Sequence, residues 1–198
     1  MLVRHGETEW NRIGRVQGLS DIPLNDTGRA QARHAGKRLA GERWDAVATS
    51  PLARAADTAR ILAAELGLPE PEVVDALVER NYGDAEGLTG AEIDARYGGT
   101  VQARESRDQV VERVRPALLA LAERHPGGRV LVVSHGGVIG SLVRDATRWA
   151  WPEQGSPIPN GSDQRFEVAD GRIRLLSFNG RPWSDDLLPP VESVQTSD

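Results

Sequence analysis

The 198-residue sequence has no cysteine and a single lysine, Lys37. All the others of its 24 lysine and arginine residues are arginine. The absence of cysteine excludes disulfide scaffolds, thiolate nucleophiles and Cys-ligated metal centres. No apolar run approaches the roughly 18 residues of a membrane span, and the first residues lack the apolar core of a signal peptide. The formal net charge of -5 argues against general nucleic-acid binding, which needs a basic face. We therefore expect a cytoplasmic protein that binds neither nucleic acid nor membrane.

Short strands alternate with helices along the chain, which predicts one α/β domain over residues 1–184 and a polar tail over residues 185–198. The expected architecture has three layers, α/β/α, around a mostly parallel central sheet. The first strand is so short that we expect it to begin upstream of Met1. The expected strands cover residues 2–3, 45–49, 73–78, 129–133, 166–168 and 173–176, and the expected helices cover residues 28–39, 51–66, 91–97, 106–125 and 138–149.

Charged or titratable side chains follow four successive strands of this pattern. They are Arg4 and His5 after the first strand, Arg54 after the second, Glu79 after the third and His135 after the fourth. Ligands of open α/β sheets bind beyond the carboxyl ends of the strands. The five side chains are therefore expected to meet at one edge of the sheet.

Two histidines, two arginines and one glutamate are compatible with more than one chemistry. Imidazole and carboxylate suit zinc, but two adjacent guanidinium groups would repel a dication. Arginine instead matches the oxygens of a phosphoryl group, and a neutral imidazole can attack phosphorus and carry it covalently. The sequence has no Gly-x4-Gly-Lys loop, which excludes a P-loop nucleotidase. Of the remaining histidines, His34 and His125 are interpreted as structural.

A series of motifs resembles, in order, those of the histidine phosphatase superfamily, also called phosphoglycerate mutase-like. The resemblance extends over most of the chain, and its strength lies in the order of the motifs rather than in any one of them. The motifs are Leu2-Val3-Arg4-His5-Gly6-Glu7-Thr8 with Trp10-Asn11, Gln17-Gly18 with Asp21, Ser50-Pro51-Leu52 with Arg54-Ala55, Glu79-Arg80 with Gly83, and Val133-Ser134-His135-Gly136-Gly137.

The resemblance implies a histidine acid-type phosphatase that hydrolyses a small phosphorylated metabolite without a metal or other cofactor. His5 would be the phosphorylated nucleophile. Glu79 would give a proton to the leaving oxygen and then activate water. Arg4, Arg54 and His135 would stabilise the phosphoryl group. The expected phosphate- and substrate-binding residues are Arg4, Asn11, Gln17, Gly18, Arg54, Glu79, His135 and Gly136.

The middle of the chain departs from the family pattern. Where the family often has Gly-Glu-Ser before the long helix, this sequence has Arg104-Glu105-Ser106, and the segment from Tyr97 to Arg104 is short. Mutases usually carry a longer insertion here, so its absence favours the phosphatase branch. Phosphoglycerate mutase-type transfer and a non-catalytic phospho-ligand-binding protein stay open as alternatives.

Several further residues are candidates for the walls of the pocket, although they are equally well explained by structural packing. They are Trp10, Arg15, Leu19, Tyr82 and Arg104.

Tryptophans near the end of the chain offer an apolar contact for a homodimer. They are Trp149, Trp151 beside Pro152, and Trp183.

Overall fold

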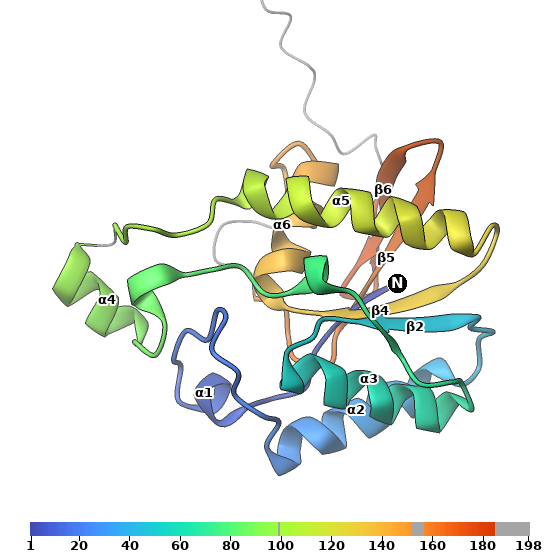
Figure 1. The fold of residues 1–198 in the computed structure, drawn as a ribbon, viewed down its shortest axis with the longest axis horizontal. Coiled ribbons are helices and arrows are strands. Elements are labelled where there is room, and N and C mark those ends of the chain that lie inside the picture. The colour runs from blue at the N-terminus through green and yellow to red at the C-terminus, as the bar shows by residue number, and fades with distance from the viewer. Residues whose placement is uncertain (99, 152–156, 185–198) are drawn as a thin grey trace, which may run out of the picture.

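The computed structural model describes residues 1–98, 100–151 and 157–184 (Figure 1). The predicted tail, residues 185–198, lies outside the described residues, as does Pro152. None of the described helices has the length and apolar character needed to cross a lipid bilayer. The strands are β1 (Leu2–Arg4), β2 (Ala46–Thr49), β3 (Glu72–Val73), β4 (Val130–Ser134), β5 (Asp163–Ala169), β6 (Arg172–Phe178) and β7 (Arg181–Pro182). The α-helices are α1 (Glu9–Arg12), α2 (Asp26–Leu39), α3 (Ala53–Leu66), α4 (Gly90–Tyr97), α5 (Arg107–Arg124) and α6 (Gly136–Ala146). Two 3-10 helices, η1 (Asp75–Leu77) and η2 (Gly83–Ala85), are also among the described elements.

Within the described residues, the strands form one seven-stranded sheet in the order β3-β2-β4-β1-β5-β6-β7. The pairs among β3, β2, β4 and β1 are parallel, whereas β5 pairs antiparallel with β1, and β6 and β7 continue antiparallel. The predicted α/β class is confirmed, but the sheet is mixed rather than mostly parallel because a hairpin extends it beyond β1. This hairpin turns at Asp170 and Gly171, whose φ angles are 50° and 70°.

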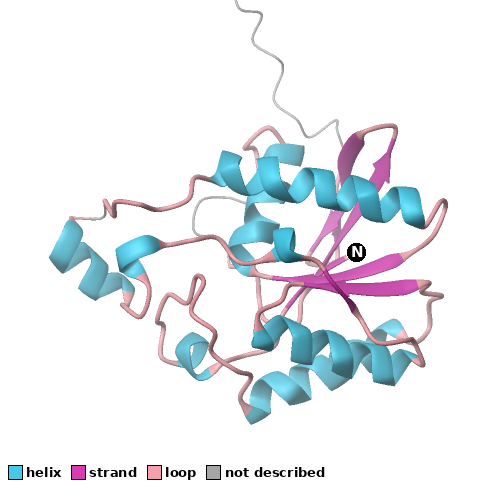
Figure 2. Ribbon diagram, viewed as in Figure 1, coloured by secondary structure: helices cyan, strands magenta, loops and turns pink. Residues whose placement is uncertain are grey.

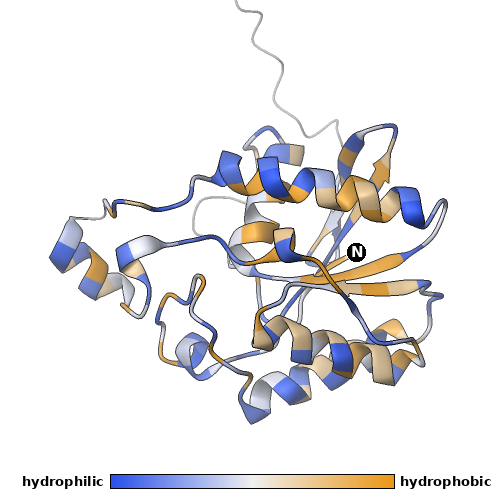
Figure 3. Ribbon diagram, in the orientation of Figure 1, coloured by the Kyte–Doolittle hydropathy of each residue, from blue (hydrophilic) through white to orange (hydrophobic). Residues whose placement is uncertain are grey.

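Helices cover both faces of the sheet, which gives the predicted three layers (Figure 2). α2 and α3 pack on one face, and α5 and α6 pack on the other. Successive side chains of the central strands point to opposite faces of the sheet, so each strand contributes to two separate hydrophobic cores. Leu2 and Val132 belong to the core beneath α5 and α6, while Val3 and Leu131 belong to the core against α2 and α3. The central strand β4 is among the most hydrophobic segments of the ribbon (Figure 3).

Two predicted elements differ from the structure. The strand predicted over residues 73–78 is wrong beyond Val73, where β3 ends and η1 follows. β3 lies at the edge of the sheet and both of its residues are exposed, so few contacts hold the chain extended there. The helix predicted over residues 138–149 is α6, which begins two residues earlier and ends before Arg148 and Trp149. Their φ angles of 48° and 65° cannot continue a right-handed helix.

The carboxyl ends of β1, β2 and β4 meet at one edge, because these strands are parallel neighbours. The register places Arg4 of β1 beside Ser134 of β4. After β1 the chain turns directly against the first turn of α2, where a Cβ atom added to Gly6 would lie 2.3 Å from the carbonyl oxygen of Gly28. Only glycine fits such a close backbone approach, and this approach fixes the loop that follows His5.

Candidate active site

The two predicted site histidines face each other at the carboxyl edge of the sheet. His5 follows β1 and His135 follows β4, and their ring centroids are 5.1 Å apart. Only 2% of His5 and none of His135 is exposed. The parallel pairing of their strands is what brings residues so distant in the sequence into contact.

His5 has one ring nitrogen occupied and one available. Its Nδ1 lies 2.6 Å from the carbonyl oxygen of Gly6, which can only accept a hydrogen bond. Nδ1 therefore carries the proton, and Nε2 holds the free electron pair. Burial lowers the pKa of His5 well below its usual range, and the charges of Arg4 and Arg54 lower that pKa further. The imidazole is neutral at pH 7, which is the form that can act as a nucleophile.

His135 has the opposite arrangement. Its Nε2 lies 2.8 Å from Oγ of Ser50, while its Nδ1 is buried with no hydrogen-bond partner among the described residues. Burial also lowers the pKa of His135 well below its usual range, followed by the charges of Arg54 and His5. If the Ser50 hydroxyl donates to Nε2, the Nδ1–H group remains available as a donor.

Arg4 and Arg54 carry the positive charge beside the histidines. Arg54 donates from Nη1 to the carbonyl of Ser20 and from Nη2 to the carbonyl of Gly18, both at 2.8 Å. Arg4 donates from Nη1 to the carbonyl of Ile158. The Nε atoms of both arginines are buried without a partner among the described residues, and burial lowers the pKa of both groups. Buried donors of this kind suit an anion, because a bound oxygen would satisfy them.

Glu79 reaches the site from η1 rather than from the end of a strand, contrary to the prediction from the sequence. Its Oε1 accepts hydrogen bonds from the backbone N–H groups of Arg80 at 2.7 Å and Val138 at 3.2 Å, and its Oε2 accepts from Gly137 at 3.1 Å. A Cβ atom on Gly137 would lie 2.6 Å from Oε1. The carboxyl group is thus held against the first turn of α6 at a position that requires glycine.

The remaining predicted binding residues lie around this centre. Oδ1 of Asn11 accepts from the backbone N–H of Thr8 at 3.2 Å, and Oε1 of Gln17 accepts from the hydroxyl of the same threonine at 2.8 Å. Gly18 presents its carbonyl to Arg54, as described above. A Cβ atom on Gly136 would lie 3.4 Å from Nε of Arg4. All four residues line the cleft described next.

A cleft of about 350 Å³ opens onto this centre. Arg54 and His135 lie below its surface, since neither is exposed. Of the candidate wall residues, Arg15 and Tyr82 line the cleft, whereas Trp10 does not and instead packs near Gly87. The lining residues are Arg4, His5, Asn11, Arg15, Val16, Gln17, Gly18, Glu79, Tyr82, Arg107, Gly136, Gly137, Gly140, Arg144 and Ile158.

The other wall candidates, Leu19 and Arg104, line a neighbouring hollow that also includes Glu79. Arg104 lies over the ring of Tyr82, with its guanidinium carbon 5.3 Å from the ring centroid. Burial, followed by the charge of Glu79, raises the pKa of Tyr82 to about 12, so its hydroxyl keeps its proton. The histidines interpreted as structural, His34 and His125, do not line the cleft.

Several residues of the cleft were not predicted from the sequence. Arg107 begins α5, while Gly140 and Arg144 lie on α6. A helical repeat counted from Gly136 would have found the last two, because residues four apart share a helix face. No local pattern distinguishes Arg107 from the other arginines of the chain.

These features can be compared with known proteins. The model of the histidine phosphatase superfamily (branch 1) matches residues 1–181. The chain belongs to the histidine phosphatase superfamily. It is 37% identical over 179 residues to the uncharacterized phosphatase PhoE of Bacillus subtilis (strain 168), covering 90% of this chain and 92% of the relative. It is also 37% identical over 190 residues to phosphoglycerate mutase-like protein 4 of Arabidopsis thaliana, covering 86% and 80%.

A solved structure of the same superfamily superposes on the chain. It is a mycobacterial glucosyl-3-phosphoglycerate phosphatase complexed with VO3, with 32% sequence identity and a TM-score of 0.81, covering 90% of this chain and 97% of that one. The fold predicted from the order of the motifs is thereby confirmed.

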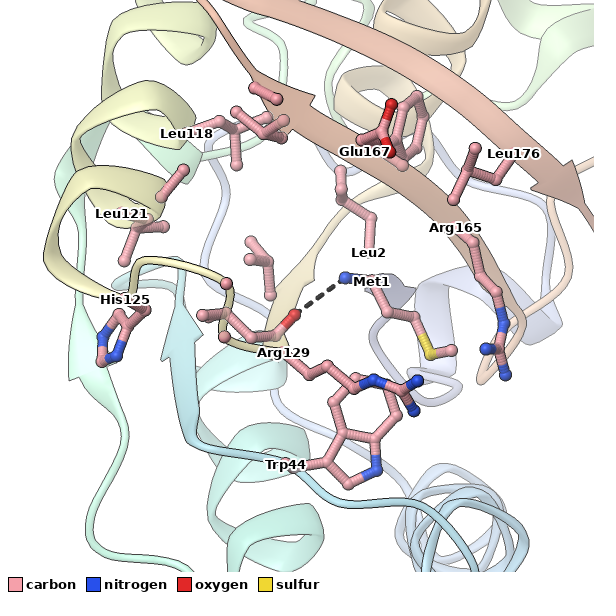
Figure 4. A pocket seen from close by; sticks show the side chains of 18 of the residues that line it. Met1, Leu2, Trp44, Leu118, Leu121, His125, Arg129, Arg165, Glu167 and Leu176 are labelled. Carbon is pink, nitrogen blue, oxygen red and sulfur yellow. Dashed lines mark hydrogen bonds between the residues drawn. The ribbon is translucent and has the colours of Figure 1, made fainter.

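A second hollow of this histidine phosphatase lies at the opposite edge of the sheet (Figure 4). It measures about 510 Å³ and is bordered by Met1, Trp44, and Leu118 and Leu121 of α5. Three of its charged side chains pair with one another, since the carboxylate of Glu42 accepts hydrogen bonds from Arg129 at 3.2 Å and from Arg165 at 2.5 Å. The dashed line in Figure 4 joins the Met1 amino group to the Val130 carbonyl, a distance of 2.8 Å. None of the predicted site residues lines this hollow.

In residues 1–98, 100–151 and 157–184, no group of three or more His, Asp or Glu side chains is placed to hold a metal ion. The positive charge of the cleft comes from arginine side chains.

Proposed function

We propose that this protein hydrolyses a small phosphorylated metabolite through a phosphohistidine formed on His5. It is a phosphoric monoester hydrolase of the histidine phosphatase superfamily, as its phosphatase relatives support. The observation that carries the mechanism is the buried, neutral imidazole of His5, which lies within the electrostatic influence of Arg4 and Arg54. The Nε atoms of these two arginines have no partner among the described residues. A cleft of about 350 Å³ is of the size that accepts a small molecule.

In the first step, Nε2 of His5 attacks phosphorus and the ester P–O bond breaks. The leaving oxygen takes a proton from Glu79, which is the carboxyl group of the cleft. Arg4, Arg54 and His135 stabilise the negative charge on the transferring phosphoryl oxygens, His135 through its available Nδ1. Asn11, Gln17, Gly18 and Gly136 complete the binding set. The reaction as proposed needs neither a metal nor another cofactor.

In the second step, water attacks the phosphohistidine and the P–N bond breaks. Glu79 now accepts the proton of the attacking water, and inorganic phosphate leaves with His5 restored. The three backbone N–H groups that hold Glu79 keep its carboxyl group in the same place for both proton transfers.

Replacement of His5 tests this mechanism. His5→Ala is expected to abolish release of phosphate from a chromogenic phosphate ester. A rapid base quench of the wild type should trap a phosphoprotein that is stable to base and loses its phosphate when the sample is acidified. His34→Ala, an exposed histidine outside the cleft, is the matched control and should keep wild-type turnover. Wild-type turnover by His5→Ala would refute the proposal.

Two alternatives make different predictions. A phosphoglycerate mutase-type enzyme would convert a phosphorylated sugar acid into its isomer without releasing phosphate. A non-catalytic binding protein would release no phosphate from any ester while a phospho-ligand still raised its melting temperature. Product analysis by phosphate detection and by NMR separates all three.

We also propose that residues 1–184 act as one domain, in the cytoplasm, as a homodimer. Trp151 and Trp183 contact each other within the chain, with ring centroids 5.4 Å apart, so a partner is not needed to cover them. Trp149 is 58% exposed and supports the dimer contact. Size-exclusion chromatography with light scattering should give the dimer mass for the wild type and the monomer mass for Trp149→Ser.

A further inference from the structure

Two arginines that the proposed reaction does not use lie on the wall of the cleft. Arg107 is the first residue of α5, and Arg144 lies in the last turn of α6. Both side chains are half-buried. An arginine that merely solubilises the surface has no reason to line a concave site, so the position of this pair calls for a ligand.

Gly140 brings the two guanidinium groups to one spot. A Cβ atom at this glycine would lie 3.5 Å from Nη1 of Arg107 and 3.6 Å from Nη1 of Arg144. Helical side chains lean toward the N-terminus, so Arg144 reaches back across the residue four positions before it. Arg107 arrives from α5, where its Nη1 lies 3.4 Å from Oγ of Ser141. Two different helices therefore build the pair.

The charges of this pair are not neutralised by neighbouring carboxylates. Among the described residues, neither Arg107 nor Arg144 forms an ion pair, whereas Arg15 on the same cleft pairs with Glu92 at 3.1 Å. Burial, followed by the positive charge of Arg107, lowers the pKa of Arg144. Two cations held together in a half-buried site repel each other, and an anion bound between them offsets that repulsion.

We propose that Arg107 and Arg144 bind a second anionic group of the substrate, which is a carboxylate or a second phosphate. This inference rests on the proposed phosphatase activity and adds the substrate class. Gly136 borders Arg4, and Gly140 borders the arginine pair four residues further along α6, which is roughly 6 Å along the helix axis. The substrate therefore carries its second anion a few bonds from the ester phosphate.

Matched pairs of esters test the proposal. 3-Phosphoglycerate and glycerol 3-phosphate differ by a carboxylate in place of a hydroxymethyl group, and propane-1,3-diol bisphosphate and 3-hydroxypropyl phosphate differ by the second phosphate. The wild type is expected to prefer the doubly anionic member of at least one pair by about ten- to hundredfold in kcat/KM, the range of a charge-assisted hydrogen bond. The preferred pair identifies the anion.

The variants then assign the preference to the arginines. In Arg107→Gln/Arg144→Gln the preference should fall toward one, and Arg107→Lys/Arg144→Lys should retain part of it. Arg174→Gln, an exposed arginine of the β5–β6 hairpin that pairs with Glu167, is the control and should keep the wild-type preference. If the double variant fails to fold, the single variants Arg107→Gln and Arg144→Gln give the same comparison, and each should lose part of the wild-type preference.

The outcomes separate this inference from the proposed function. An unchanged preference in the double variant overturns the inference, as does a wild type that hydrolyses all four esters without preference. If the wild type releases phosphate from none of the four esters and from no chromogenic ester, the proposed function fails and the substrate class fails with it.

Discussion

The chemistry of single residues here depends on which ring nitrogen of each buried histidine is free. In His5 the backbone carbonyl of Gly6 holds Nδ1, so Nε2 keeps its free electron pair. In His135 the contact with Ser50 occupies Nε2, and Nδ1 has no partner among the described residues. In the proposed mechanism the two side chains take complementary roles, with His5 as the nucleophile and His135 as a hydrogen-bond donor to the phosphoryl group.

Glu79→Gln should keep the position of the side chain but remove the proton transfer. Its amide oxygen can still accept backbone hydrogen bonds, so we expect folding to be retained and turnover to fall by about 10²–10⁴-fold, the usual contribution of general acid–base catalysis. The loss in the first step should be greatest for esters of alcohols with a high pKa. Steady-state and single-turnover rates for p-nitrophenyl and alkyl phosphates measure this loss. If the variant hydrolysed each ester as fast as the wild type does, Glu79 would not have this role.

The two histidines also predict how stability depends on pH. Their pKa values are well below the usual range in the folded protein and near 6.5 in the unfolded chain. Between those values the unfolded chain binds protons that the folded protein does not. Stability is therefore full above pH 6.5 and falls as the pH drops below it, by at most about 1.4 kcal/mol per pH unit for each histidine.

Urea denaturation at pH 7.5 and pH 5.5 measures this dependence. His135→Gln should show a smaller loss on acidification than the wild type, because one of the two groups no longer titrates. His34→Gln, on the exposed face of α2, should behave like the wild type. An identical loss in all three proteins would mean that carboxylates alone cause the dependence.

At the scale of elements, the site is assembled by strand ends, helix starts and one close backbone contact. Arg4, His5 and His135 could be placed from the sequence because each follows a short apolar run that is buried between two helical layers. Glu79 could be selected but not placed, because the chain leaves the sheet at an exposed edge strand and returns through a 3-10 helix. Arg107 could not be selected at all, since its partner across Gly140 belongs to another helix.

Gly6→Ala tests the contact between the loop after β1 and the start of α2. The new Cβ atom would lie 2.3 Å from the carbonyl oxygen of Gly28. The backbone of the loop after β1 or the backbone at the start of α2 must therefore shift to make room. We expect a loss of about 1–3 kcal/mol in the free energy of unfolding, as for other overpacked sites, together with a lower turnover because His5 is the preceding residue.

The matched control is Gly41→Ala, whose Cβ atom would meet nothing within 4 Å. We expect its stability to stay within about 0.5 kcal/mol of the wild type. Chemical denaturation and turnover of both variants provide the comparison. A Gly6→Ala protein with wild-type values for both would show that the two segments separate at no cost.

At the scale of the whole molecule, the mean charge and the local charge differ in sign. The formal net charge is -5, yet the cleft collects Arg4, Arg15, Arg107 and Arg144 around one carboxylate, Glu79. A small anion that enters the cleft therefore meets a local excess of positive charge that the formal net charge does not reveal.

Inorganic phosphate should stabilise the folded protein, because the folded state alone gathers these donors. At a concentration of 100 times its dissociation constant, we expect about 2.7 kcal/mol of added stability. For a chain of this size that corresponds to an increase of roughly 5–10 °C in Tm. Thermal denaturation in phosphate and in sodium chloride of equal ionic strength measures the effect. Arg4→Met should remove most of the difference between the two salts, and an equal Tm in both for the wild type would contradict the prediction.

The central position of β1 also determines when the site can form during synthesis. β1 pairs with β4 and β5, and Leu2 lies opposite Val132 and Gln164. At about 5–20 residues per second, a ribosome needs on the order of ten seconds or more to make the chain between them. For that interval β1, which leads into His5, lacks both of its neighbours in the sheet. The pocket around His5 can therefore be completed only after β4 and β5 have been synthesised.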